Sequence, residues 1–389
     1  MLTIKAIFKF FLVLVLVCAL ASSCVYDYEP KDARVQGLGK PLVVIDGDII
    51  VGGITNVAIG LTESLTGEMP EMPIGITVNV ESESGDLVSG LLVDDVHNVF
   101  EVDTRELDMG TRYRLNIAIP GMGEYVSEFK RVMVSPPIDE ITWSRSDDGT
   151  YINIEVTTHN MNTDKLYCKW NFYENWESNS VYTPFVEFNP LLGRGWLGVR
   201  NLTIEETLER KYCWSESTSA EICIANTEKL SKNIISKYVL RRIVPTDTRV
   251  SGLYSITVSQ KALDKDAYIY WETLKRNTGG TGGIFSAQPT DLRGNIRCMT
   301  NPEEYVIGYI SVSTRTEIRH FIDWEKQDFY NPGCSSFSLK NMNTDVWSTK
   351  YYEGYRMYAV DENTEWWSYH RCVDCRVYSN STRPDFWPR

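Results

Sequence analysis

The 389-residue sequence predicts a mostly-β protein with two sandwich-like domains and one notable helix in the second domain. Short runs of alternating apolar and polar residues recur about every ten residues, with glycine turns between them, which is typical of sandwich strands. The segment Ser135-Pro136-Pro137 interrupts these runs, and strand periodicity restarts after it. Because adjacent prolines stiffen a link and cannot donate to a strand ladder, we place the domain boundary there.

The first domain, residues 41–135, is expected to be an immunoglobulin-like or transthyretin-like sandwich. Its strands are expected at residues 41–46, 57–61, 74–80, 111–119 and 125–134. In the fourth of these strands, alternation with period two places the apolar side chains on one face. These side chains are Tyr113, Leu115, Ile117 and Ile119.

The second domain, residues 136–389, is expected to be larger and also rich in strands, with a cysteine-linked C-terminal segment. Its strands are expected at residues 138–143, 152–157, 167–173 and 254–259, and residues 305–313 are expected to close its sheet. Residues 174–212 are rich in Asn, Pro and Gly, so we expect an irregular insertion there.

One segment of the second domain has the period of a helix instead of a strand. Between about Asp264 and Arg276, apolar residues recur at i, i+3, i+4 and i+7, which places them on one helical face. Asp264 is expected to cap the start of this helix, and Asn277 with the glycines after it is expected to end it. The apolar face consists of Ala267, Tyr270, Trp271 and Leu274.

The first 23 residues have the pattern of a secretory signal peptide. Lys5 and Lys9 precede a short apolar run, and small residues lead to Cys24. A cysteine at this point matches the bacterial lipobox, whose thiol and freed amine carry acyl chains that anchor the protein to a membrane. An ordinary signal peptide with a chance cysteine is the alternative. We therefore expect lipidation at Cys24, followed by an acidic tether over residues 24–40.

Charge excludes nucleic acid as a partner. Without residues 1–23 the chain has 37 basic and 52 acidic residues, a net charge of −15, whereas nucleic-acid-binding proteins carry basic patches. The same charge opposes adsorption to anionic lipid heads, so membrane attachment is expected through the lipid anchor.

Cysteine usage predicts structural disulfides, which an exported location permits. We expect Cys168, in an alternating strand, to be a buried free thiol. One hairpin could be closed by a bond between Cys213 and Cys223, which are close in sequence. The Cys372/Cys375 pair could be bonded to Cys298 and Cys334. Six cysteines allow 15 pairings, so these alternatives stay open. The disulfide candidates are Cys213, Cys223, Cys298, Cys334, Cys372 and Cys375.

Short motifs for catalysis, metals or cofactors are missing from the sequence. The spacing Cys372-Val-Asp-Cys375 would suit zinc, but a zinc ribbon needs a second such pair. No His-Glu-x-x-His or Gly-x-Ser-x-Gly pattern occurs. We therefore expect no metal, no cofactor and no catalytic residues, while noting that a carboxylate-based site leaves no short motif.

Aromatic side chains of the 174–212 segment are the candidate contacts for a partner or a ligand, because Tyr and Trp dominate binding hot spots. The alternative is that they pack the insertion onto the second domain. The candidates are Trp176, Tyr182, Phe185 and Trp196, which we expect to be exposed.

Several stretches resemble the Bacteroidetes lipoproteins of domain of unknown function 4249. They are Leu42–Gly47, Gly110–Leu115, Pro136–Ile141, Gly294–Cys298, Val306–Tyr309, Cys372–Cys375 and Arg383–Trp387. The resemblance spans nearly all of the mature chain. It departs from the family at residues 380–382, where Asn-Ser-Thr stands in place of Gly-Gly-Thr.

The resemblance implies an outer-membrane lipoprotein that acts with a TonB-dependent receptor in nutrient uptake. The acidic cluster of Asp27, Glu29 and Asp32 resembles the signals that send some Bacteroidetes lipoproteins to the cell surface, so we expect the protein to face that surface. In this role the protein would be a non-enzymatic accessory or ligand-capture subunit. An adhesion or envelope scaffold is the first alternative, and a hydrolase with an unrecognised carboxylate site is the second. No catalytic residue is implied, because the family has none assigned.

Overall fold

The computed structural model describes residues 41–63, 71–161, 164–279, 293–324, 332–339, 345–361, 364–380 and 382–388. The expected signal peptide, Cys24 and the expected tether lie outside the described residues. The chain divides into two compact units, Met1–Pro41 with Leu61–Pro70 and Leu42–Gly60 with Glu71–Arg389. Almost all described residues belong to the second unit, and they are mostly in strands, which confirms the predicted fold class.

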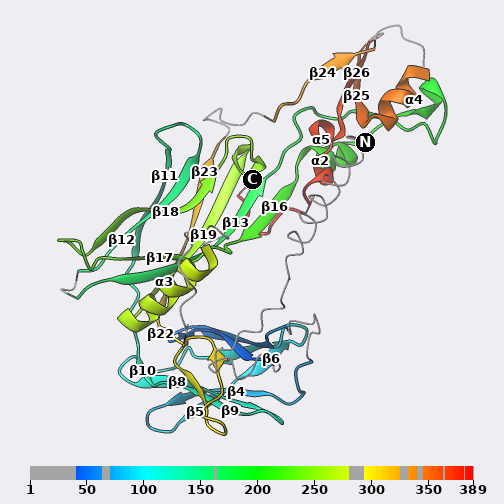
Figure 1. Cartoon of the computed structure of the whole chain (residues 1–389). Helices are drawn as coiled ribbons and strands as arrows, with labels where there is room; N and C mark the ends of the chain where they lie inside the picture. Colours follow the sequence, from blue (N-terminus) through cyan, green and yellow to red (C-terminus); the bar gives the residue numbers. More distant parts are fainter. Residues whose placement is uncertain are drawn as a thin grey trace, which may run out of the picture. The chain divides into compact units, whose positions relative to one another are not determined.

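Two sheets contain the strands of the first predicted domain (Figure 1). One sheet has the order β21-β1-β3-β7-β6, and the other has the order β20-β9-β8-β4-β5 with β10 beside β8. The bounds of these strands are β1 Val43–Gly47, β3 Ile54–Leu61, β4 Thr77–Ser82, β5 Leu87–Ser89, β6 Leu91–Asp94, β7 Val99–Asp103, β8 Arg112–Ile119, β9 Gly123–Ser127, β10 Lys130–Arg131, β20 Ile296–Cys298 and β21 Val306–Ile307.

Strand β8 has the face that its sequence predicts. The four apolar side chains expected on one face are all buried, and the residues between them are more exposed, because successive side chains of a strand point to opposite faces of the sheet. The buried side chains are those of Tyr113, Leu115, Ile117 and Ile119.

The segment 305–313 does not close a sheet of the second domain, so that prediction is wrong. Strand β21 pairs in parallel with β1. Strand β22 (Val312–Ser313) pairs in parallel with β2 (Ile49–Ile50), and β20 pairs with β9. Residues 296–313 therefore pair with strands that lie more than 160 residues earlier in the chain. The sequence did not reveal these partners, because β21 and β22 have only two residues each, and a strand of two residues has no periodic pattern.

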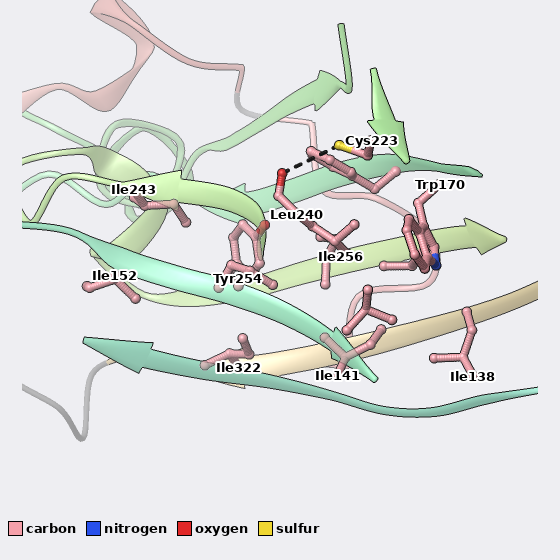
Figure 2. Packing of buried hydrophobic residues seen from close by; sticks show 14 of the residues in the cluster. Ile138, Ile141, Ile152, Trp170, Cys223, Leu240, Ile243, Tyr254, Ile256 and Ile322 are labelled. Carbon is pink, nitrogen blue, oxygen red and sulfur yellow. Dashed lines mark hydrogen bonds between the residues drawn. The ribbon is translucent and has the colours of Figure 1, made fainter. Parts of the chain in front are cut away.

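The second group of strands forms a sandwich with an apolar core. One sheet has the order β11-β12-β18, and the other has the order β16-β13-β19-β23 with β17 beside β13. Figure 2 shows isoleucine, leucine and aromatic side chains of both sheets pointing toward one another. The bounds are β11 Ile138–Arg145, β12 Ile152–His159, β13 Tyr167–Glu177, β16 Trp214–Thr218, β17 Cys223–Asn226, β18 Ile234–Ile243, β19 Leu253–Ala262 and β23 Arg315–Asp323.

The predicted helix is α3, which spans Lys265–Gly279. The carboxylate of Asp264 accepts a hydrogen bond from the backbone N–H of Ala267 at 2.7 Å, which caps the helix as expected. Ala267 and Tyr270 are buried in a cluster with Ile224 of β17, and Trp271 and Leu274 pack against that cluster. The period of the sequence therefore identified both the helix and the face that it buries.

A buried group of charges lies around Asp48, in the turn between β1 and β2. The carboxylate of Asp48 accepts a hydrogen bond from the ammonium of Lys261 on β19. Burial alone would raise the pKa of Asp48, but Lys261 and Lys169 outweigh burial and hold it below its ordinary value. Burial lowers the pKa of Lys169 to about 8, and its Nζ lies 3.0 Å from the centre of the Trp271 ring.

The remaining elements make up the C-terminal body. It includes most of the 174–212 segment, which is not irregular, because it contains two paired strands and a helix with a capping box at Thr203 and Glu206. Its core contains Phe188, Trp347 and Trp367. The elements are β14 Val186–Phe188, η2 Gly195–Gly198, β15 Val199–Asn201, α2 Ile204–Lys211, β24 Ser336–Ser338, α4 Asp345–Tyr352, β25 Tyr355–Asp361, β26 Thr364–Tyr369, α5 His370–Val373 and η5 Cys375–Val377, and η3 Thr248–Val250 lies outside this body.

Candidate functional site

Disulfides cross-link the C-terminal body. Cys213, which follows α2, is bonded to Cys375 at the start of η5, with a sequence separation of 162. Cys334, which precedes β24, is bonded to Cys372 in α5, with a separation of 38. The expectation that Cys213 bonds Cys223 is therefore wrong, as is the expectation that Cys298 bonds the Cys372/Cys375 pair. Cys372 and Cys375 are each bonded to a cysteine from an earlier segment, so together they form neither a redox pair nor a zinc-binding pair.

The other cysteines of the described chain are free and buried. Cys168, the thiol expected to be unpaired, lies on β13, and burial raises its pKa far above the ordinary value. Burial also raises the pKa of the Cys223 thiol to about 11, and its Sγ donates to the carbonyl of Leu240 at 3.8 Å (Figure 2). Cys298 lies on β20 with its Sγ 3.2 Å from the Thr300 hydroxyl. Because the thiolate is the reactive form, the high pKa values make Cys168 and Cys223 structural residues.

Trp176 is not the exposed contact residue that the sequence suggested. Only 6% of its surface is exposed, and it belongs to the core of the second sandwich. Its indole N–H donates to the hydroxyl of Thr248 at 3.0 Å, and the guanidinium of Arg249 lies 4.1 Å from the ring centre. The packing alternative is therefore the correct one for Trp176.

The other candidate aromatics lie in the C-terminal body and differ in exposure. Tyr182 is partly buried and stacks on Tyr358, with ring centroids 4.9 Å apart. Phe185 is 59% exposed. Trp196 is 54% exposed, and its edge packs against Trp347 of the core at a centroid distance of 5.0 Å. Phe185 and Trp196 therefore remain candidates for contact with a partner.

Leucines surround Trp196 in the loop between β14 and β15. Leu191 is 82% exposed and Leu197 is 85% exposed, and Leu192 is exposed as well. We call Leu191, Leu192, Trp196 and Leu197 the apolar loop. Burying one leucine contributes about 1.5–3 kcal/mol, so four large exposed apolar side chains within seven residues do not serve the stability of the isolated chain. Sequence reasoning identified Trp196 and missed the leucines, because it considered only aromatic residues.

Glycines and the body's core hold the apolar loop in place. Gly195 has a φ of 58°, a conformation that favours glycine. At Gly198 a Cβ would lie 2.4 Å from the carbonyl oxygen of Gly193, so only glycine fits there. The N–H of Asn189 donates to the carbonyl of Gly198 at 2.9 Å, which closes the loop, and Phe188 beside it packs against Trp347. The apolar side chains are thus presented on an ordered turn.

The same body contains a charged cavity with a volume of about 260 Å³. Its wall includes two aromatic residues, Phe188 and Tyr351, and residues from β14, α2, β25, α5 and η5. Most of the charged side chains in the wall are basic. They are Arg210, Arg356, Arg376 and His370, with the carboxylates of Glu187 and Asp374. We call this the arginine-lined cavity.

The carboxylate of Asp374 cannot act as a general acid in this cavity. Burial would raise its pKa, but His370 and Arg376 outweigh burial and hold the pKa of Asp374 well below its ordinary value. Arg376 binds it with two hydrogen bonds, of 2.9 and 2.8 Å. A general acid needs a raised pKa, so this carboxylate does not favour the hydrolase alternative.

The described ranges contain neither a membrane-spanning helix nor a metal cluster. None of the helices there is both long and apolar enough to cross a bilayer. No group of three or more His, Cys, Asp or Glu residues suited to a metal ion occurs among the residues that the structure describes.

Similarity to solved structures is weak. The chain is similar to a trypsin-activated alpha-2-macroglobulin from Escherichia coli, with 9% identity, a TM-score of 0.20, and coverage of 58% of this chain and 14% of the other. A DUF4785 family protein from Legionella pneumophila has 10% identity, a TM-score of 0.20, and coverage of 56% and 52%. A Salmonella alpha-2-macroglobulin mutant has 8% identity, a TM-score of 0.18, and coverage of 78% and 15%.

The chain spans about half or less of the length of these structures, and TM-scores of this size support no inference about function. No curated protein matches the chain. A family model, described as domain of unknown function (DUF4249), matches residues 26–319. This match covers most of the chain and agrees with the resemblance found in the sequence, and the chain therefore belongs to the DUF4249 family.

Proposed function

We propose that this protein is a lipid-anchored, non-enzymatic binding subunit of the outer membrane that works with a TonB-dependent receptor in nutrient uptake. The observation that carries the proposal is the apolar loop, since contiguous exposed apolar side chains mark protein interaction sites. The lipobox pattern at Cys24 supports the anchor, and the polar segment expected at residues 24–40 would serve as the tether.

The apolar loop has the features of a protein contact. It presents a tryptophan among leucines, and tryptophan is enriched in binding hot spots. Arg200 near its end is held by Glu206 at 2.7 and 2.9 Å and by Glu187 at 2.6 Å, so polar side chains surround it. An apolar centre with a polar rim is the usual composition of a protein interface.

Exchange of two leucines tests the proposal. In L191S/L197S the loop loses two of its most exposed apolar side chains and keeps Trp196 on the core. Because Leu191 and Leu197 are exposed, the melting temperature should stay within about 2 °C of the wild type. The tagged protein is isolated in mild detergent, and its partners are identified by mass spectrometry.

The matched control is L91S/L92S, which exchanges two exposed leucines of β6 in the first sandwich. We expect the wild type and the control to retain a TonB-dependent receptor and L191S/L197S to lose it. Retention of the receptor by L191S/L197S would place the interface elsewhere. Recovery of envelope components without a receptor, by the wild type itself, would favour the scaffold alternative.

A further inference from the structure

The arginine-lined cavity contains a guanidinium group that lacks an acidic partner. Arg210 pairs with Glu187 at 2.6 Å, and Arg376 pairs with Asp374 at 2.8 Å. Arg356 forms no ion pair within the described ranges of the chain. Its Nη1 donates to the backbone carbonyls of Tyr351 and Tyr355 at 3.0 and 2.8 Å. The other N–H groups of Arg356 have no acceptor among the residues that the structure describes.

Packing holds Arg356 rigidly at the cavity wall. Its guanidinium lies 3.9 Å from the centre of the Tyr351 ring, and a stacked guanidinium keeps its edge free for hydrogen bonds. Burial lowers the pKa of Arg356, although the nearby Tyr351 and Asp374 act to raise it. Arg356 is thus a partly buried cation with no ion pair of its own in the described ranges, and such a group favours the binding of an anion.

A second arginine of the wall also has an unsatisfied donor. The Nε–H of Arg210 is buried and has no hydrogen-bond partner within the described part of the chain. Buried donors without an acceptor are rare in native proteins, and each calls for an explanation such as a bound ligand or an ordered water. Two side chains from different elements, α2 and β25, thus offer free N–H groups at one cavity.

Charge counting limits the ligand to a monoanion. Among the described residues that line the cavity, three guanidinium groups face two carboxylates, and Glu209 outside the lining lies 3.6 Å from Arg376, so the excess positive charge is at most one. A phosphate dianion would leave an uncompensated negative charge beside Glu187 and Asp374. A planar carboxylate matches the fork of an arginine and carries one charge.

We propose that the arginine-lined cavity binds the carboxylate group of a small organic acid, with Arg356 as its principal charged contact. The volume of about 260 Å³ is below the range of drug-sized sites, so the ligand is small. The Phe188 and Tyr351 rings in the wall provide apolar contact for the rest of the acid. This inference does not depend on the apolar loop or on a receptor.

Calorimetric titration of the purified protein tests this proposal. The probes are benzoate, whose ring suits the aromatic wall, together with acetate and inorganic phosphate. The variants are R356Q, which removes the charge, and R356K, which keeps the charge and removes the fork. The matched control is R319Q, because Arg319 on β23 also stacks on an aromatic ring, that of Phe386 at 3.5 Å, and does not line the cavity.

We expect benzoate to bind the wild type and R319Q equally, and to bind R356Q about tenfold or more weakly, as for the loss of a charged hydrogen bond. The affinity of R356K for benzoate should lie between those of the wild type and R356Q. If R356Q does not fold, R356K is compared with the wild type instead. Binding by R356Q that equals the wild type would overturn the proposal, as would tighter binding of phosphate than of benzoate. Failure of all three probes to bind the wild type would overturn it too.

Discussion

Removal of the Cys213–Cys375 bond should destabilise the protein more than removal of the Cys334–Cys372 bond. A disulfide restricts the unfolded chain, and the restriction grows with the length of the loop that it closes. The sequence separations are 162 and 38 residues. The loop-entropy relation then gives about 5 kcal/mol for the first bond and about 4 kcal/mol for the second.

The second loop lies inside the first, because Cys334 and Cys372 both fall between Cys213 and Cys375. The inner bond therefore shortens the outer loop to roughly 125 residues, which lowers the outer contribution by only a few tenths of a kcal/mol on the same relation. The outer bond thus remains the stronger constraint by about 1 kcal/mol.

Urea unfolding of the double variants C213A/C375A and C334A/C372A, followed by tryptophan fluorescence, measures these differences in the free energy of unfolding. C298A is the control, because Cys298 is buried but forms no disulfide. Alanine avoids burying an unsatisfied hydroxyl. A lower stability of C334A/C372A than of C213A/C375A would refute the dependence on loop length, as would unfolding of C213A/C375A at the same urea concentration as the wild type.

Trp176→Ala should lower the free energy of unfolding by about 3–5 kcal/mol, because it empties a buried core site, whereas Trp196→Ala should lower it by about 1 kcal/mol or less; thermal melting separates them, and equal losses would contradict the assignment of Trp176 to the core. The lowered pKa of Lys169 makes the stability rise with pH between about 8 and 10, because there the unfolded chain, with a lysine pKa of about 10.4, binds more protons than the folded chain. From pH 8 to pH 9.5 the free energy of unfolding of the wild type should rise by up to about 2 kcal/mol relative to that of Lys169→Met. Urea unfolding that gives the same difference between the two proteins at both pH values would refute this. Cys24→Ser should leave the chain unlipidated and outside the membrane fraction; a mature variant that still sediments with membranes would show that the anchor lies elsewhere.

Local periodicity made much of the fold predictable. The face of β8 and the face of α3 were both read from the spacing of apolar residues, because a strand repeats every two residues and a helix every 3.6. The return of residues 296–313 to the first sandwich was not predictable in this way. Strands β21 and β22 have two residues each, so their partners are chosen by tertiary packing.

Exposure and cysteine pairing were the least predictable features of the candidate site. Trp176 and Trp196 look alike as aromatic residues of one segment, but β13 extends far enough to place Trp176 inside a sandwich. Leu191 and Leu197 would be read as core residues in most sequences, and only the fold shows them exposed. Spacing does not determine disulfide connectivity, and Cys213 is bonded to Cys375 at the start of η5, 162 residues away.

The cross-link and the arginine-lined cavity depend on the same meeting of distant segments. Arg210 lies three residues before Cys213, and Arg376 directly follows Cys375. The Cys213–Cys375 bond therefore holds two guanidinium groups of the wall near each other, although they are far apart in the sequence. Like charges repel, and Glu187, Glu209 and Asp374 form ion pairs with these two arginines, whereas Arg356 forms none in the described ranges. The guanidinium of Arg356 then remains for a ligand, and no local motif marks the cavity because its residues come from distant segments.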